Sequence, residues 1–120
     1  MEHGNGSGRI GRAAEDRALA LLVTSGLQLV ERNFRCRLGE IDLVMRDRGT
    51  VVFVEVRLRR SASHGTAAES IDARKLRRLQ AAALIWQRWR GFDGPLRLDV
   101  VTLDGGTPAD ARIEWIRGAG

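Results

Sequence analysis

Cysteine, histidine and lysine are almost absent from this chain of 120 residues. Cys36 is the single cysteine, which excludes an internal disulfide and a metal cluster built from cysteine alone. It is better explained as a half-buried strand residue than as a nucleophile. His3 and His64 stand far apart in Gly- and Ser-rich stretches, so neither has a partner at the spacing of a zinc site. Zinc chemistry is therefore not expected.

Long apolar runs are also missing. The first six residues contain no apolar signal-peptide region, and no stretch approaches the length needed to span a membrane. We therefore expect a cytoplasmic protein without a membrane partner. A chain of 120 residues forms one domain with a single core. We expect a disordered Gly-rich tail at 1–8, one domain at 9–117 and a short tail at 118–120.

Arginine supplies nearly all of the positive charge, since Lys75 is the only lysine. The net charge is +5 and the isoelectric point is about 11.1. Guanidinium groups make planar, bidentate contacts with phosphate, whereas lysine acts as a point charge. A basic domain of this kind suits a nucleic-acid partner. The alternative is that the arginine content reflects genome bias.

Two neighbouring segments each place one acid in an apolar strand pattern. They read GEIDLV at 39–44 and VFVEVR at 52–57, with Asp42 and Glu55 as the acids. Strands this close in sequence normally pair as an antiparallel hairpin, because a short turn is enough to connect them. The sequence therefore predicts that the two carboxylates meet in space.

The apolar pattern of the hairpin predicts its register. With Arg48 and Gly49 as the turn residues, one face is wholly apolar, because a slip of one residue would set Ile41 against Glu55. That face pairs Met45 with Val52, Leu43 with Val54, and Ile41 with Val56. The other face pairs Val44 with Phe53, Asp42 with Glu55, and Glu40 with Arg57.

Opposed carboxylates on a rigid sheet are costly. Directly paired residues have Cβ atoms about 5 Å apart, and two like charges at that separation repel by roughly 3 kcal/mol with an effective dielectric near 20. A divalent metal between Asp42 and Glu55 removes this cost, and Mg²⁺ prefers carboxylate, water and phosphate oxygens. The alternative is a rim pair that Arg57 and neighbouring arginines neutralise.

Hydrophobic periodicity predicts seven elements along the chain. Residues 9–25 have a helical apolar stripe, and Glu15 lies at its edge. This acid either points toward the hairpin or is an ordinary boundary glutamate. Three strands follow at 27–37, 40–46 and 51–58, then a polar loop at 59–66. A helix at 70–90, with Ser70 as its N-cap, precedes strands at 96–103 and 112–116.

The predicted second helix has an apolar side and a basic flank. Arg74, Lys75 and Arg78 belong to the flank, which either contacts a nucleic-acid backbone or is a solvated face. Its tryptophans are better explained by core packing than by base stacking. The order α-β-β-β-α-β-β predicts an α/β fold in which helices pack on a mixed sheet.

Several segments together resemble a known family. They are Gly11–Asp16, 32–35, 39–44, 52–57 and 97–101. The helix glutamate, the strand aspartate and the Glu55-Val56-Arg57 run resemble the PD-(D/E)XK nucleases, with Ile41 in place of the motif's proline. More closely, the chain resembles the YraN family of endonuclease-like bacterial proteins. The resemblance implies a restriction-endonuclease-like core, shared with archaeal Holliday junction resolvases, and Mg²⁺- or Mn²⁺-dependent phosphodiester hydrolysis.

The resemblance also implies roles for single residues. Asp42 and Glu55 would bind the metal, and Glu15 would complete the acidic shell. Arg57 stands where the motif has its catalytic lysine, but a guanidinium stays protonated and cannot act as a base. It can still stabilise charge that develops on the phosphate. A metal-bound hydroxide could supply the nucleophile.

Three functions are open at this point. The first is a metal-dependent endonuclease on structured DNA or RNA, DNA being the more expected, in which Arg59, Arg74, Lys75 and Arg78 bind the nucleic acid. The second is a non-catalytic nucleic-acid-binding module of the same fold. The third is an adaptor in DNA processing whose interface is the second helix, which requires an exposed Trp89. A homodimer is an open alternative, because symmetric cleavage of a junction needs two sites.

Overall fold

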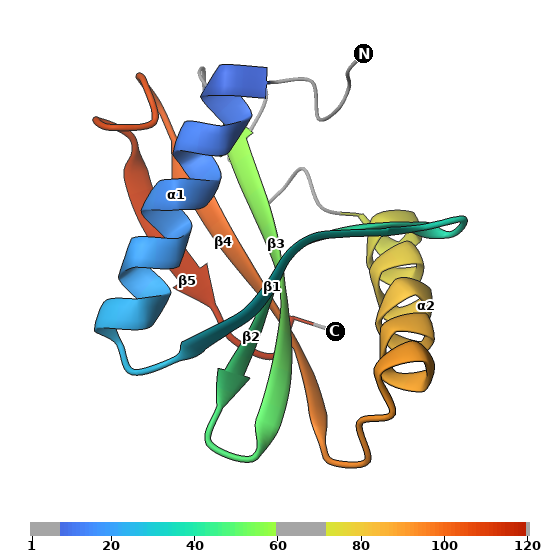
Figure 1. The fold of residues 1–120 in the computed structure, drawn as a ribbon. Helices are drawn as coiled ribbons and strands as arrows, with labels where there is room; N and C mark the ends of the chain where they lie inside the picture. Colours follow the sequence, from blue (N-terminus) through green and yellow to red (C-terminus); the bar gives the residue numbers. More distant parts are fainter. Residues whose placement is uncertain (1–7, 60–71, 120) are drawn as a thin grey trace.

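A five-stranded sheet lies between two helices in the computed structural model, which describes residues 8–59 and 72–119 (Figure 1). The order of elements is the predicted one. The elements are α1 (Gly8–Thr24), β1 (Gln28–Cys36), β2 (Gly39–Asp47), β3 (Thr50–Arg59), α2 (Ala73–Arg90), β4 (Leu96–Asp104) and β5 (Arg112–Ile116). Residues 1–7 of the predicted tail at 1–8 and residues 60–66 of the predicted loop at 59–66 lie outside the described residues. Gly8 already belongs to α1, and Arg59 ends β3. Within the described ranges, no helix is long and apolar enough to cross a membrane.

The sheet is mixed, as the sequence predicts. Its strands follow chain order, β1-β2-β3-β4-β5. All neighbours are antiparallel except β3 and β4, which run parallel because α2 carries the chain back across the sheet. Parallel neighbours of this kind require a long crossover. The α/β fold with helices packed on a mixed sheet is therefore confirmed.

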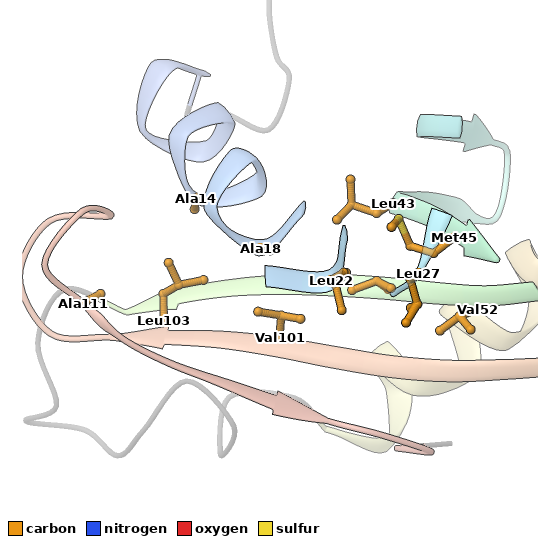
Figure 2. Packing of buried hydrophobic residues seen from close by; sticks show 11 residues of the cluster. Ala14, Ala18, Leu22, Leu27, Leu43, Met45, Val52, Val101, Leu103 and Ala111 are labelled. Atoms are coloured by element: carbon orange, nitrogen blue, oxygen red, sulfur yellow. The ribbon is translucent and has the colours of Figure 1, made fainter. Parts of the chain in front are cut away.

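Each face of the sheet has its own apolar core, one under each helix. The core under α1 contains Ala14, Ala18 and Leu22 from the helix, which form one cluster with Leu43 and Met45 of β2 (Figure 2). The core under α2 contains the helix residues Leu79, Ala82, Ala83 and Trp86, together with Phe34, Ile41, Val44, Val51, Phe53 and Leu98. Because both faces are covered, β2 and β3 are apolar on both sides at their paired end.

The predicted register of the hairpin is confirmed between its turn and its centre. The paired residues run from Asp47 and Thr50 at the turn to Leu43 and Val54. Arg48 has a φ of 59°, which fits a two-residue turn between the strands. The pairs predicted beyond Leu43 are not formed: Asp42 does not pair with Glu55, Ile41 with Val56, or Glu40 with Arg57.

The strands separate at Asp42 because its side chain takes the place of a backbone partner. The carboxylate of Asp42 accepts a hydrogen bond of 2.7 Å from the backbone N–H of Val56. On the other side of β2, Asn33 of β1 has a φ of 54°, and the β1–β2 pairing passes over it. The two irregularities turn Ile41 into the core under α2, where it pairs with Phe34. Its predicted place on the face of Leu43 is wrong.

The start of α2 also differs from the prediction. Asp72 is the N-cap, and its side chain accepts from the backbone N–H of Lys75 at 2.9 Å. The predicted cap, Ser70, lies outside the described residues. The helix ends at Gly91, whose left-handed φ of 65° places its N–H on the last helical carbonyls.

Asp99 is a fully buried acid of β4 that anchors the end of the chain. It accepts from the guanidinium of Arg97 at 3.0 and 3.1 Å, from the Trp115 indole at 2.9 Å and from the Gly118 backbone N–H at 3.0 Å. The N–H of Ala119 bonds to the carbonyl of Leu98 at 2.7 Å. Four donors satisfy this buried charge, so we infer a structural role for it.

We predict that Asp99→Asn destabilises the protein by about 2–4 kcal/mol, because the amide presents N–H groups to donors and removes the buried charge. Urea denaturation measures the change. The control is Asp47→Asn, which removes a half-exposed partner of the same Arg97 at 3.1 Å and should cost no more than about 1 kcal/mol. Equal effects of the two changes would contradict this role for Asp99.

Candidate functional site

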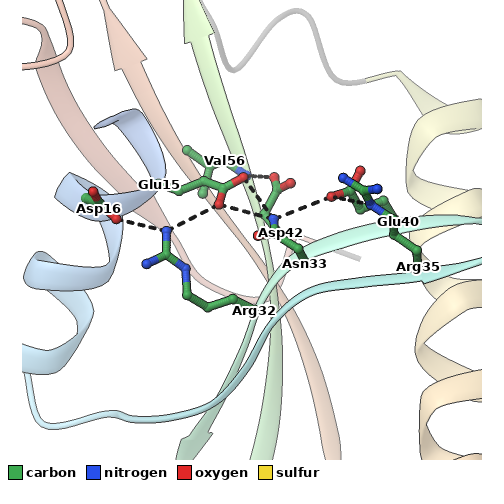
Figure 3. A network of polar contacts seen from close by, with 8 residues as sticks. All are labelled: Glu15, Asp16, Arg32, Asn33, Arg35, Glu40, Asp42 and Val56. Carbon is green, nitrogen blue, oxygen red and sulfur yellow. Dashed lines mark hydrogen bonds and ion pairs between the residues drawn. The ribbon is translucent and has the colours of Figure 1, made fainter. Parts of the chain in front are cut away.

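Four carboxylates gather where β2 leaves β3. Asp42 belongs to β2, Glu55 to β3, Glu15 to α1, and Glu40 to the start of β2. The Asp42 carboxyl is influenced by the charges of all three other acids. Figure 3 shows Glu15 and Asp42 side by side, with Glu40 beyond Asn33. The predicted meeting of Asp42 with Glu55 therefore occurs, although the two are not a ladder pair.

Asp42 is the acid most strongly disfavoured as an anion. Its pKa is raised well above the ordinary aspartate value, first by burial and then by the negative charge of Glu55. The hydrogen bond from the Val56 N–H acts in the opposite direction, because it favours the charged form. Burial and a neighbouring acid outweigh that bond, so Asp42 holds a proton more tightly than an exposed aspartate.

Glu55 is 4% exposed, and its pKa is also raised, mainly by burial. Two cations limit this rise. The Lys75 ammonium of α2 lies 3.4 Å from the Glu55 carboxylate, and the Arg57 guanidinium lies 3.8 Å from it. Interaction with Asp42 favours the charged form of Glu55 as well. Both carboxyls of the pair are therefore harder to ionise than exposed ones, and the nearby cations favour the charged form of Glu55.

Glu15 is buried but already engaged by other side chains. The amide of Asn33 lies 3.2 Å from each of its carboxylate oxygens, and the Arg32 guanidinium lies 3.4 Å from one of them. Arg32 also bonds to the exposed Asp16 at 2.9 Å. Glu15 thus faces the Asp42 carboxyl from α1, as the functional alternative predicts, with its oxygens held by a separate network (Figure 3).

These residues fit a hard divalent cation through two carboxylates. Mg²⁺ takes oxygen ligands, commonly one or two carboxylates, and fills its other positions with water and phosphate oxygens. Asp42 and Glu55 supply that donor set, and a bound cation would relieve the cost of their buried charge. Across residues 8–59 and 72–119, no three His, Cys, Asp or Glu side chains converge tightly enough to hold a metal ion. We therefore count Asp42 and Glu55 as the candidate metal ligands and treat Glu15 as a neighbour of this pair.

Asn33 is a residue of this site that the sequence prediction missed. It belongs to the quoted segment 32–35, but no role was assigned to it. Besides bonding to Glu15, its amide lies 3.4 Å from the Glu40 carboxylate, which Arg35 approaches at 3.5 Å. An asparagine tolerates the left-handed backbone that the bend of β1 requires. Its position before Phe34, at a break in the strand pattern, was the only available signal.

The four predicted nucleic-acid-binding residues lie in different surroundings. Lys75 is committed to Glu55, and Arg59 ends β3 opposite Asp104. Arg74 is exposed in the first turn of α2, and Arg78 lines a groove beside the β1–β2 hairpin tip. Lys75 and Arg78 thus place positive charge along one side of the acidic site.

The tryptophans of α2 divide between core and surface. The Trp86 ring is buried, and its indole N–H bonds to Glu31 at 3.0 Å. Trp89 is 60% exposed, as the adaptor hypothesis requires, while its ring packs edge-on to Phe34 at 5.6 Å.

Comparison with known proteins identifies the family. The family described as "Uncharacterised protein family UPF0102" matches residues 14–103, which span every acid of the site. The chain belongs to the UPF0102 family. It is 49% identical to a UPF0102 protein of Pseudomonas putida (strain KT2440) over 113 residues, 92% of this chain and 91% of the relative. The resemblance to the YraN family is thereby confirmed.

Other UPF0102 relatives are similarly close. A protein of Pseudomonas entomophila (strain L48) is 50% identical over 113 residues, which cover 91% of this chain and 90% of the relative. One from Methylococcus capsulatus (strain Bath) is 48% identical over 109 residues, 91% of this chain and 88% of the relative. These matches place nearly the whole chain, with both helices and the hairpin, inside the UPF0102 family.

We predict that Asp42→Asn stabilises the metal-free protein at pH 8. The amide keeps an oxygen for the Val56 N–H and removes one charge of the buried pair, a gain of about 1–3 kcal/mol. Thermal unfolding in EDTA measures it, and the melting temperature should rise by several degrees.

The stabilisation by Asp42→Asn should become smaller as the pH falls. A raised pKa means that the folded state binds more protons than the unfolded state, so wild-type stability decreases as the pH rises from about 4 through the raised value. At pH 4 the wild-type carboxyl is protonated, and the two proteins should unfold at nearly the same temperature. A lower melting temperature for the variant at pH 8 would contradict this account.

Proposed function

We propose that this UPF0102 protein is a metal-dependent phosphodiester hydrolase that acts as an endonuclease on structured nucleic acid. The observation that supports the proposal best is the pair formed by the half-buried Asp42 and the buried Glu55, both with raised pKa values, in which Arg57 and Lys75 approach Glu55. A stable protein does not need such a pair for folding, because buried carboxylates without sufficient counter-charge lower stability. A site that binds a divalent cation together with a phosphate accounts for it.

In this proposal Asp42 and Glu55 hold Mg²⁺ or Mn²⁺. The cation, when bound, polarises the phosphoryl oxygens and lowers the pKa of a bound water. Asp42 would hold the cation as a carboxylate, so its raised pKa means that metal binding would compete with protonation of this side chain. The bond from the Val56 N–H fixes the orientation of the Asp42 carboxylate.

Arg57 and Lys75 have different capacities beside the same acid. Arg57 stays protonated and can stabilise negative charge on a phosphate. Lys75 is the only lysine of the chain and lies nearer to Glu55, at 3.4 Å against 3.8 Å for Arg57. An ammonium group can exchange a proton with water where a guanidinium cannot. We therefore assign the stabilisation of phosphate charge to Arg57. We assign to Lys75 the role of the motif's lysine, which is to exchange a proton with water.

Cleavage assays test this function. Junction, flap and single-stranded DNA, and matching RNA, are incubated with the full-length protein and Mg²⁺ or Mn²⁺. The expected result is metal-dependent cleavage that Asp42→Ala and Glu55→Ala reduce at least 100-fold, as expected when a metal ligand is removed.

The matched control is Asp16→Asn, which removes one negative charge from the neighbouring Arg32 network at an exposed position. Its cleavage rate should stay within about 3-fold of wild type, since surface ion pairs contribute little. Activity that survives Asp42→Ala and Glu55→Ala unchanged would rule out this mechanism.

A second candidate is a nucleic-acid-binding module without turnover. Two observations favour it: Arg57 replaces the motif's lysine, and Glu15 does not join Asp42 and Glu55 in a three-ligand group among the described residues. It predicts salt-dependent binding of the same substrates with no cleavage under either metal. The cleavage assay therefore separates the two candidates.

A further inference from the structure

A groove lies between the tip of the β1–β2 hairpin and α2. The hairpin tip reaches past the edge of the sheet toward the first half of α2 (Figure 1). The groove has a volume of about 550 Å³ and is lined by Cys36, Arg37, Leu38, Gly39, Arg77, Arg78 and Ala81. Among the described residues, its charged lining consists of three arginines and no acid.

The arginines of this groove differ from several others in the described part of the chain. No hydrogen bond or ion pair in the described part of the chain engages the side chain of Arg37, Arg77 or Arg78. By contrast, Arg32, Arg90 and Arg97 each contact a carboxylate at 2.7–3.1 Å. Three exposed guanidinium groups around one concave surface leave a positive charge that the protein itself does not neutralise.

Two elements, α2 and β2, link the groove to the acidic site. Arg78 follows Lys75 on α2 by one helical turn, a rise of roughly 4.5 Å, and Lys75 contacts Glu55. On the hairpin, Gly39 precedes Asp42 by three residues, or roughly 10 Å of extended chain. A β-carbon on Gly39 would lie 3.9 Å from the Arg78 backbone oxygen, so the hairpin and α2 are in close approach here.

We propose that this groove binds the phosphate backbone of the strand that leaves the Asp42–Glu55 site. The inference rests on the proposed nucleic-acid substrate and adds Arg37 and Arg77 to its binding surface. Successive phosphates of one strand are roughly 3.4 Å apart along the helix axis. With one phosphate at the metal site, the phosphates about three nucleotides away would therefore lie within the groove. Arg37, Arg77 and Arg78 contact these phosphates, and the half-exposed Leu38 contacts a sugar or base.

A nucleic-acid strand suits the groove better than an acidic peptide. The arginines lie on two elements that face each other, so they can approach a string of phosphates from both sides with bidentate contacts. The groove also shares α2 and β2 with the Asp42–Glu55 pair, where a bound cation would attract a phosphate.

Binding measurements on the full-length protein test this inference. The variant is Arg37→Gln with Arg77→Gln, and the ligand is a fluorescent 12-nucleotide single strand, in EDTA so that cleavage does not interfere. The slope of log K against log salt concentration should fall in magnitude by about 1.4, or roughly 0.7 for each lost phosphate contact. Affinity at low salt should fall at least 10-fold.

The matched control is Arg48→Gln with Arg117→Gln. These exposed arginines lie beside Asp47 and Thr50, near the β2–β3 turn, and the change removes the same charge. Its slope should stay within about 0.3 of wild type if the groove is the binding surface. Equal slopes for the two double variants, a wild type that does not bind, or equal competition by polyglutamate of the same length would each overturn the inference.

Cys36 supplies an independent readout, because it lines the groove and is the only cysteine of the chain. Bound oligonucleotide should slow its alkylation by iodoacetamide at least 5-fold in wild type, and not in the Arg37 and Arg77 variant. Alkylation that proceeds unchanged in saturated wild type would overturn the inference. A different result would contradict the proposed hydrolase and leave the groove in place. In that result the strand binds with the expected salt dependence and protects Cys36 from alkylation, but neither metal supports cleavage.

Discussion

The hydrogen bond from the Val56 backbone N–H to the Asp42 carboxylate is the constraint on which the site depends. It occupies a backbone donor that would otherwise pair with β2, so the two strands separate at that point. The separation gives the Asp42 carboxyl a position that Glu55 approaches from β3 and Glu15 from α1. A regular ladder would have set Asp42 and Glu55 side by side on one face, away from α1.

The same separation explains why charge is distributed unevenly around the acids. On the α1 side, Arg32 and Asn33 hold Glu15 in a closed network with Asp16. On the α2 side, Lys75 and Arg57 contact Glu55. Asp42 lies between these groups with one backbone donor. The raised pKa of Asp42 follows from this position, since burial and its negative neighbours outweigh the hydrogen bond from the Val56 N–H.

Much of this arrangement could be predicted from sequence, because the information is local. The alternation of Leu43, Met45, Val52 and Val54 was enough to establish the hairpin register near the turn. The order of the elements and the mixed sheet followed from periodicity. The prediction for Ile41 was wrong because it assumed that alternation continues through Asp42. The bend depends on a side chain that competes with the backbone and on the left-handed Asn33, and neither changes the hydrophobic pattern.

The metal site is the central claim, and a calorimetric titration of the full-length protein with Mn²⁺ tests it most directly. Because the pKa of Asp42 is raised and a carboxylate binds a metal in its charged form, cation binding should release protons at any pH where Asp42 is still protonated. The account predicts one saturable site, a heat that varies with the ionisation enthalpy of the buffer, and loss of both in Asp42→Asn. No saturable heat, or the same heat in the variant, would contradict the account.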